Sequence, residues 1–172
     1  GYNRIYQAHA VVRLKELIES CQSIGFIVNV VAHSNGTLMT LAALLLGASL
    51  QNVIFAGSPL DCDNLRSQQE LSFASQNVKG TIFNFWTPKD SLASLKGGIG
   101  ALGDNHVYVE KNPQIYNIAL LHGHFIKGHR VYSYHSILPM TEQEHHSTRS
   151  YHSDYFSQEN APITKEYLQE FH

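Results

Sequence analysis

The pattern of hydrophobic and polar positions predicts a helix in residues 4–20, near the start of the chain. Apolar residues recur there at helical spacing, with charged residues between them. The expected buried stripe consists of Ala10, Leu14 and Leu17, with Val11 and Ile18 beside it. Gly25 follows at a position typical of a helix end, because glycine readily adopts the left-handed conformation that closes many helices.

Three apolar stretches predict buried parallel strands. They read "FIVNVVA" (26–32), "NVIFAG" (52–57) and "GTIFNFW" (80–86). Their apolar residues do not alternate with polar ones, which is typical of central strands covered on both faces. Between the first two, "GTLMTLAALLLG" (36–47) predicts a helix that is apolar nearly all round and is therefore buried.

The rest of the chain carries weaker patterns. Residues 58–76 predict a loop with one short helix, and "HVYVE" (106–110) and "IYNIALL" (115–121) are further strand candidates. Residues 122–160 are polar, rich in His, Ser and Tyr, and have little periodicity, so we expect a polar loop. Residues 164–171 predict a closing helix.

This alternation of strands and helices predicts an α/β fold with a doubly wound, largely parallel sheet. We expect a single domain over residues 1–172, which is long enough to bury a sizeable core. Domains of this class usually open with a strand, whereas this chain opens on a helix. We therefore expect early strands to come from an upstream segment or a partner chain.

Composition narrows the class of protein. Hydrophobic residues make up 43% and charged residues 15%, and the formal net charge is -2, so the chain is globular, with no basic surface for nucleic acid. The longest apolar run is far shorter than the roughly 20 residues of a membrane-spanning helix. Cys21 and Cys62 form no CxxC motif, and the sequence leaves open whether they pair. Localisation stays open.

The segment "VVAHSNGTL" (30–38) places Ser34 between a predicted strand and a predicted helix. Residues 32–36 match the G-x-S-x-G nucleophile elbow, with Ala in the first place, and small neighbours leave room for a sharp turn. The next helix would point its N-terminus at the reacting oxygen, so the Asn35 amide is the expected oxyanion-hole donor. The alternative is that Ser34 merely caps that helix.

A nucleophilic serine needs a histidine base and an acid that orients it. In this architecture their order along the chain is Ser, acid, His. Asp90 lies four residues beyond the third predicted strand and is the favoured acid, with Asp61 in reserve. His152, in the polar loop "YHSDYF", is the favoured base, and His135 in "YHSIL" is the nearest rival. The other downstream histidines are His106, His122, His124, His129, His145, His146 and His172.

The segments "VAHSNG", "NVIFAGSPLD", "FNFWTPKDSLASL" and "YHSDYF", in this order, resemble the core of an α/β-hydrolase of the lipase and esterase type. The resemblance implies Ser34 as nucleophile, Asp90 as acid and His152 as base. It also implies hydrolysis of carboxylic esters, with a small-molecule or lipid ester as substrate and with no metal or other cofactor. The family's second oxyanion donor lies upstream of the elbow, where this chain has only a helix and a strand.

Three other interpretations remain. Residues 98–103 spell G-x-G-x-x-G, but the nearest predicted strand ends at Trp86, so a flexible loop near the active site fits better than a dinucleotide site. His122, His124, His129 and His135 could supply metal ligands, although no H-E-x-x-H motif is present. The alternative function is a non-catalytic binding or structural module on a hydrolase scaffold.

Overall fold

The computed structural model describes residues 8–60, 65–86, 90, 115–126, 129–136, 152 and 155–156. Its elements alternate as α2 (His9–Ser23), β1 (Val30–His33), α3 (Asn35–Leu45), β2 (Val53–Ala56), α4 (Leu65–Ser75), β3 (Ile82–Trp86), β4 (Ile115–Ile126) and β5 (His129–Ser136). Cys62, residues 98–103, "HVYVE" and the predicted closing helix lie outside the described residues.

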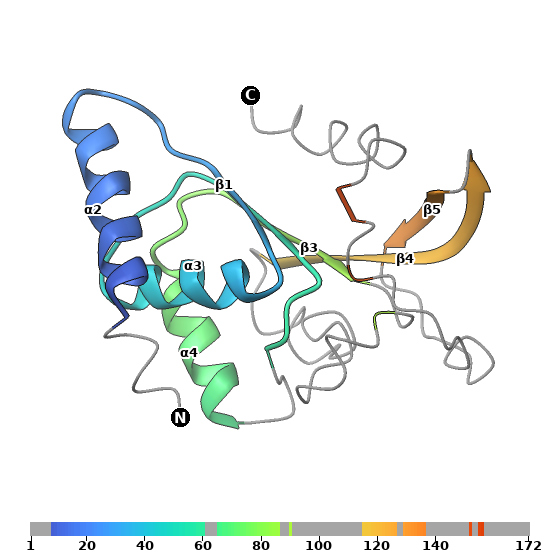
Figure 1. Cartoon of the computed structure of the whole chain (residues 1–172). Helices are drawn as coiled ribbons and strands as arrows, with labels where there is room; N and C mark the ends of the chain where they lie inside the picture. Colours follow the sequence, from blue (N-terminus) through green and yellow to red (C-terminus); the bar gives the residue numbers. More distant parts are fainter. Residues whose placement is uncertain are drawn as a thin grey trace.

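The five described strands form one sheet in the order β1-β2-β3-β4-β5. The first four strands are parallel, and β5 pairs with β4 in antiparallel orientation. Figure 1 shows α2, α3 and α4 grouped beside β1 and β3. The predicted α/β class with a largely parallel sheet is confirmed, and the arrangement is compatible with a doubly wound sheet.

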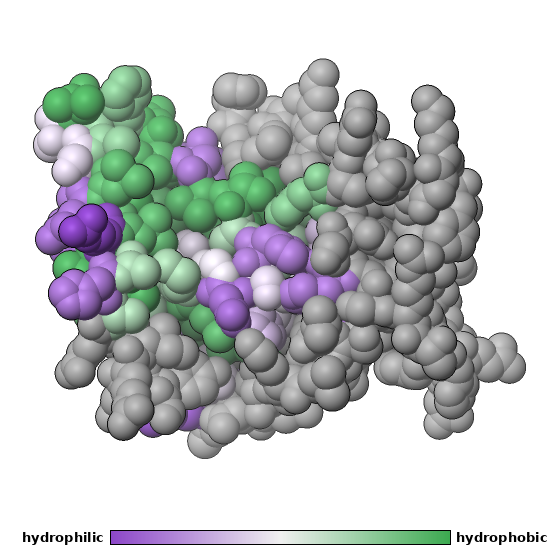
Figure 2. All heavy atoms as spheres, in the orientation of Figure 1, coloured by the Kyte–Doolittle hydropathy of each residue, from purple (hydrophilic) through white to green (hydrophobic). Residues whose placement is uncertain are grey.

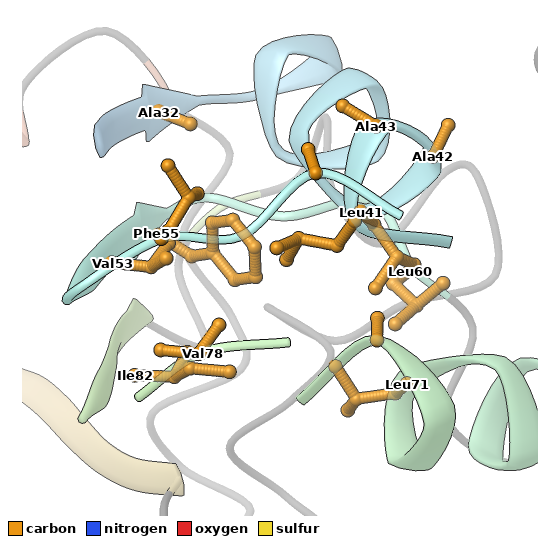
Figure 3. Packing of buried hydrophobic residues seen from close by; sticks show 14 of the residues in the cluster. Ala32, Leu41, Ala42, Ala43, Val53, Phe55, Leu60, Leu71, Val78 and Ile82 are labelled. Atoms are coloured by element: carbon orange, nitrogen blue, oxygen red, sulfur yellow. The ribbon is translucent and has the colours of Figure 1, made fainter. Parts of the chain in front are cut away.

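The hydrophobic core lies between the first strands and the helices. Phe55 of β2 and Leu41 of α3 point toward one another there, with Leu71 of α4 close by (Figure 3). Val53 and Phe55 of β2 belong to this core. Ile54 and Ala56 alternate with them and therefore face the other side of the sheet, where they too are fully buried. Both faces of β2 are therefore covered, as the unbroken apolar run "NVIFAG" predicts.

The first helix is present, but its buried stripe differs from the predicted one. Val11 and Ile18 are buried, whereas Ala10 is exposed and 61% of Leu17 is accessible to solvent. Leu14 of the predicted stripe is partly buried against the core, so the buried face of α2 is rotated toward Val11 and Ile18, where α2 packs against α3. The helix ends at Ser23, and Gly25 has a φ of +92°, in agreement with the predicted helix stop.

The first predicted strand is shorter and less covered than expected. Strand geometry covers Val30–His33 only, and β1 lies at one edge of the described sheet rather than at its centre. Val31 is 46% exposed, and Phe26 and Ile27, which lead into the strand, are more exposed still. Hydrophobic surface extends over α2 and the segment that follows it (Figure 2).

Two segments that the sequence predicts as mainly polar loop contain regular structure. The helix α4 is as long as α3, at 11 residues. The expected strand at 115–121 continues to Ile126 and pairs with β5, so a long antiparallel pair replaces the first part of the predicted loop at 122–160. His122, His124, His129 and His135 therefore lie on strands rather than in a loop.

Candidate active site

Parallel pairing places Ser34 and Gly57 side by side at the carboxyl edge of the sheet. His33 of β1 pairs with Ala56 of β2, and Ala56 pairs with Phe85 of β3. The Ser34 amide donates to the Ala56 carbonyl at 3.0 Å, and the Gly57 amide donates to the Phe85 carbonyl at 3.1 Å. Ligands in parallel α/β sheets usually bind at this edge.

Ser34 occupies a sharp turn between β1 and α3. Its φ of 54° makes it the non-glycine residue with positive φ in the described part of the chain. Such a conformation costs free energy in a residue with a Cβ and is common at functional sites. The turn is supported by Thr37, whose hydroxyl donates to the Ser34 carbonyl at 2.7 Å and lies 2.8 Å from the Ser58 hydroxyl.

The helix-cap alternative for Ser34 is correct in position only. Ser34 is the N-cap residue of α3, but its side chain makes no capping hydrogen bond. Instead, Ser34 Oγ lies 2.6 Å from Nε2 of His152. The hydroxyl is therefore directed away from the helix, toward a base that is distant in the sequence.

His152 bridges Ser34 and Asp90. Its Nδ1 lies 2.9 and 2.8 Å from the two carboxylate oxygens of Asp90. A carboxylate can only accept hydrogen bonds, so Nδ1 carries the proton and Nε2 is left to accept from Ser34 Oγ. Asp90 is 1% exposed and His152 is 9% exposed, whereas Ser34 is partly accessible. This is the arrangement that a serine nucleophile needs.

The structure thus brings together the three residues that the sequence selects, which we call the candidate triad (Ser34, His152 and Asp90). Asn35, the expected oxyanion donor, is the first residue of α3. The rival base His135 lies on β5 and pairs with Ala119 of β4, and the reserve acid Asp61 lies outside the described residues. That these residues act in catalysis stays a prediction.

Two further residues of the site escape sequence analysis. The Tyr155 hydroxyl donates to Asp90 Oδ2 at 3.1 Å, and its side chain is buried. Gly57 has a φ of +56°, and a Cβ there would lie 2.8 Å from both Asp90 Oδ2 and Tyr155 Cε2. Tyr155 belongs to the segment "YHSDYF" and Gly57 ends "NVIFAG", but only the fold shows that they meet.

A third residue, His33, precedes Ser34 and is half-buried. Its Nε2 lies 2.5 Å from the main-chain oxygen of His152. Burial lowers the pKa of His33 below its ordinary value, and nearby His152 lowers it further, while the hydrogen bond to the His152 main chain and the charge of Asp90 oppose this. Desolvation dominates, so the His33 imidazole favours its neutral form.

The described side chains contain no group of three His, Cys, Asp or Glu residues placed to hold a metal ion. The side chains of His122, His124, His129 and His135 are not among them, so the metal hypothesis is untested. No helix in the described ranges is long and apolar enough to cross a membrane.

One comparison with known proteins gives a match. The sequence model of a protein family, the T6SS Tle3 phospholipase effector domain, matches residues 2–79. This range includes Ser34 and Gly57 but neither Asp90 nor His152. This similarity to a lipase-type effector supports an enzyme that hydrolyses lipid esters. No curated protein and no solved structure gave a significant match.

Proposed function

We propose that this chain is a serine hydrolase that cleaves carboxylic esters of lipids through Ser34, His152 and Asp90. The observation that carries the proposal is the pair of contacts made by His152, at 2.6 Å to Ser34 Oγ and at 2.8 Å to Asp90 Oδ2. The similarity to a phospholipase effector domain supports a phospholipid as the substrate class.

The reaction follows from the tautomer of His152. As Ser34 Oγ attacks the ester carbonyl, its proton passes to His152 Nε2, and the Asp90 carboxylate stabilises the resulting imidazolium. The tetrahedral oxyanion would lie against the Asn35 amide at the N-terminus of α3, where the helix dipole favours negative charge. His152 then protonates the leaving alcohol, and an acyl-Ser34 ester remains.

The second half of the reaction uses the same groups. A water molecule attacks the acyl-Ser34 carbonyl, and His152 Nε2 takes its proton. His152 then returns this proton to Ser34 Oγ as the acyl–Oγ bond breaks, so that the carboxylic acid leaves and Ser34 is regenerated. The residues of the candidate triad supply every proton transfer in this scheme. We propose that residues 1–172 act as one hydrolase domain.

Covalent labelling tests the nucleophile directly. A fluorophosphonate probe is expected to add once to the parent chain, as seen by intact mass, and not to Ser34→Ala. Ser58→Ala removes a neighbouring buried hydroxyl and should keep the adduct. Asp90→Asn should slow labelling by about 10⁴-fold, because His152 would lose its acceptor and adopt the wrong tautomer.

The products identify the bond that is cleaved. With phosphatidylcholine vesicles, we expect the parent chain to release fatty acid and Ser34→Ala to release none. Release of the headgroup would instead indicate a phosphodiesterase. A folded parent chain that neither labels nor releases fatty acid would contradict catalysis and favour the non-catalytic module.

A further inference from the structure

We propose that His33 is a positioning residue of the candidate triad: its Nε2–H holds the main chain of His152, so that His152 stays within reach of Ser34. This inference rests on the proposed function and adds to the triad a residue that touches no reacting atom.

The hydrogen bond between His33 and His152 has a defined direction. A carbonyl oxygen can only accept, so His33 Nε2, 2.5 Å away, must carry the proton and donate it. The bond joins residues that are 119 positions apart in the sequence. It therefore ties the segment that carries the base to the end of β1, next to the nucleophile.

Three described side chains, those of His152, Tyr155 and Phe156, lie around the His33 ring. The ring centroids of His152, Tyr155 and Phe156 lie 4.7, 6.0 and 6.1 Å from that of His33. Asp90 and Ser34 fix the ends of the His152 imidazole, while His33 fixes its main chain. Together these contacts determine both the position and the orientation of the base.

A neutral side chain suits this place. During ester cleavage His152 becomes an imidazolium, and a second positive charge 4.7 Å away would oppose that change. The lowered pKa of His33 keeps its imidazole neutral, so it donates the hydrogen bond without adding charge.

Two substitutions separate the hydrogen bond from simple packing. His33→Leu fills a similar volume without a donor, whereas the amide nitrogen of His33→Gln lies the same three bonds from Cβ as Nε2 does. We expect His33→Leu to lower kcat by about 10-fold with little change in KM, as the loss of one hydrogen bond would produce. His33→Gln should stay within about threefold of the parent. His9→Gln, at an exposed position on α2, is the matched control.

Three results would overturn the inference. Unchanged kcat in His33→Leu, a change in KM alone, or equal losses in the Leu and Gln variants would each contradict a donor that positions His152. Thermal unfolding of each variant shows that a lost activity is not a lost fold.

A second measurement does not depend on turnover. NMR of the His152 Nδ1 proton, which is hydrogen-bonded to Asp90, reports the position of the ring in the resting protein. We expect this signal in the parent and in His33→Gln, and its loss through exchange with solvent in His33→Leu. If the parent shows this pattern but no hydrolysis, the proposed function fails and the positioning role stands. Persistence of the signal in His33→Leu would refute the role.

Discussion

At the scale of single residues, the site depends on close approach at Gly57. The carboxylate of Asp90 and the ring of Tyr155 occupy the space where any other residue would place its Cβ. The left-handed φ of +56° adds backbone strain for a residue other than glycine. Gly57 therefore permits the acid, the base and Tyr155 to meet at the end of β2.

Gly57→Ala should displace Asp90 and His152 and lower kcat/KM by about 100-fold, since a misplacement of about 1 Å can have an effect of that size. Gly36→Ala is the matched control, because among the described residues outside its own helix the added Cβ would meet only Ala32 Cβ, at 3.8 Å, an ordinary contact. Its activity should stay within about threefold of the parent. Steady-state kinetics and the rate of fluorophosphonate labelling measure the activity of both variants. Equal losses in Gly57→Ala and Gly36→Ala would contradict the argument that a Cβ at position 57 displaces Asp90 and His152.

The difference between the two glycines also refines the nucleophile-elbow pattern. The motif places small residues at positions 32 and 36, and Ala32 and Gly36 do face one another. However, the distance between them leaves room for a methyl group. The strict requirement for glycine lies instead on the neighbouring strand, at a position that the motif does not contain.

At the scale of elements, α2 shows how tertiary packing selects one helix face. The sequence permits two adjacent stripes, and the structure buries Val11 and Ile18 while 61% of Leu17 is exposed. Ile18→Ala should therefore lower the free energy of unfolding by about 2–5 kcal/mol, as is usual when a core side chain is truncated. Leu17→Ala should change it by about 0.5 kcal/mol or less. Denaturant unfolding of both variants measures this, and a larger loss for Leu17→Ala would favour the stripe predicted from the sequence.

The elements that the sequence predicts well are those with strong local patterns. The strand β2 is apolar throughout, β3 is apolar except for Asn84, and the helix α3 is apolar nearly all round, so local composition already determines their burial. The first part of β4, residues 115–121, was expected as a strand, whereas its continuation to Ile126 and the strand β5 were missed. These missed parts are rich in polar residues and gain their regular structure from pairing with each other.

Some residues of the candidate site could likewise be predicted from local sequence patterns, and others could not. Ser34, Asp90 and His152 could be selected because the elbow motif and the order of the triad are readable along the chain. His33, Gly57 and Tyr155 could not, because their contacts with the triad span 33 to 119 positions and exist only once the sheet has formed.

At the scale of the whole molecule, the buried imidazole of His33 couples stability to pH. Its pKa is lowered in the folded state, chiefly by desolvation, while in the unfolded chain it takes up a proton near pH 6.5. Below that pH the unfolded state binds more protons at this residue, so the free energy of unfolding falls as the pH falls. The contribution of neutral His33 is fully present above about pH 6.5 and is lost as the pH drops through the lowered pKa.

His33→Gln isolates this contribution, because glutamine does not titrate and keeps a donor for the His152 carbonyl. Denaturant unfolding of the parent and the variant between about pH 7.5 and 5 should give two curves that diverge on the acid side, with the parent losing more stability. Every other histidine is common to both proteins, so the difference between the curves reports His33 alone. Parallel curves would mean that the pKa of His33 is the same in the folded and unfolded states, and a parent that gains stability in acid would mean that folding raises this pKa. Either result would remove the argument that a neutral His33 lies beside His152 when the base takes up its proton.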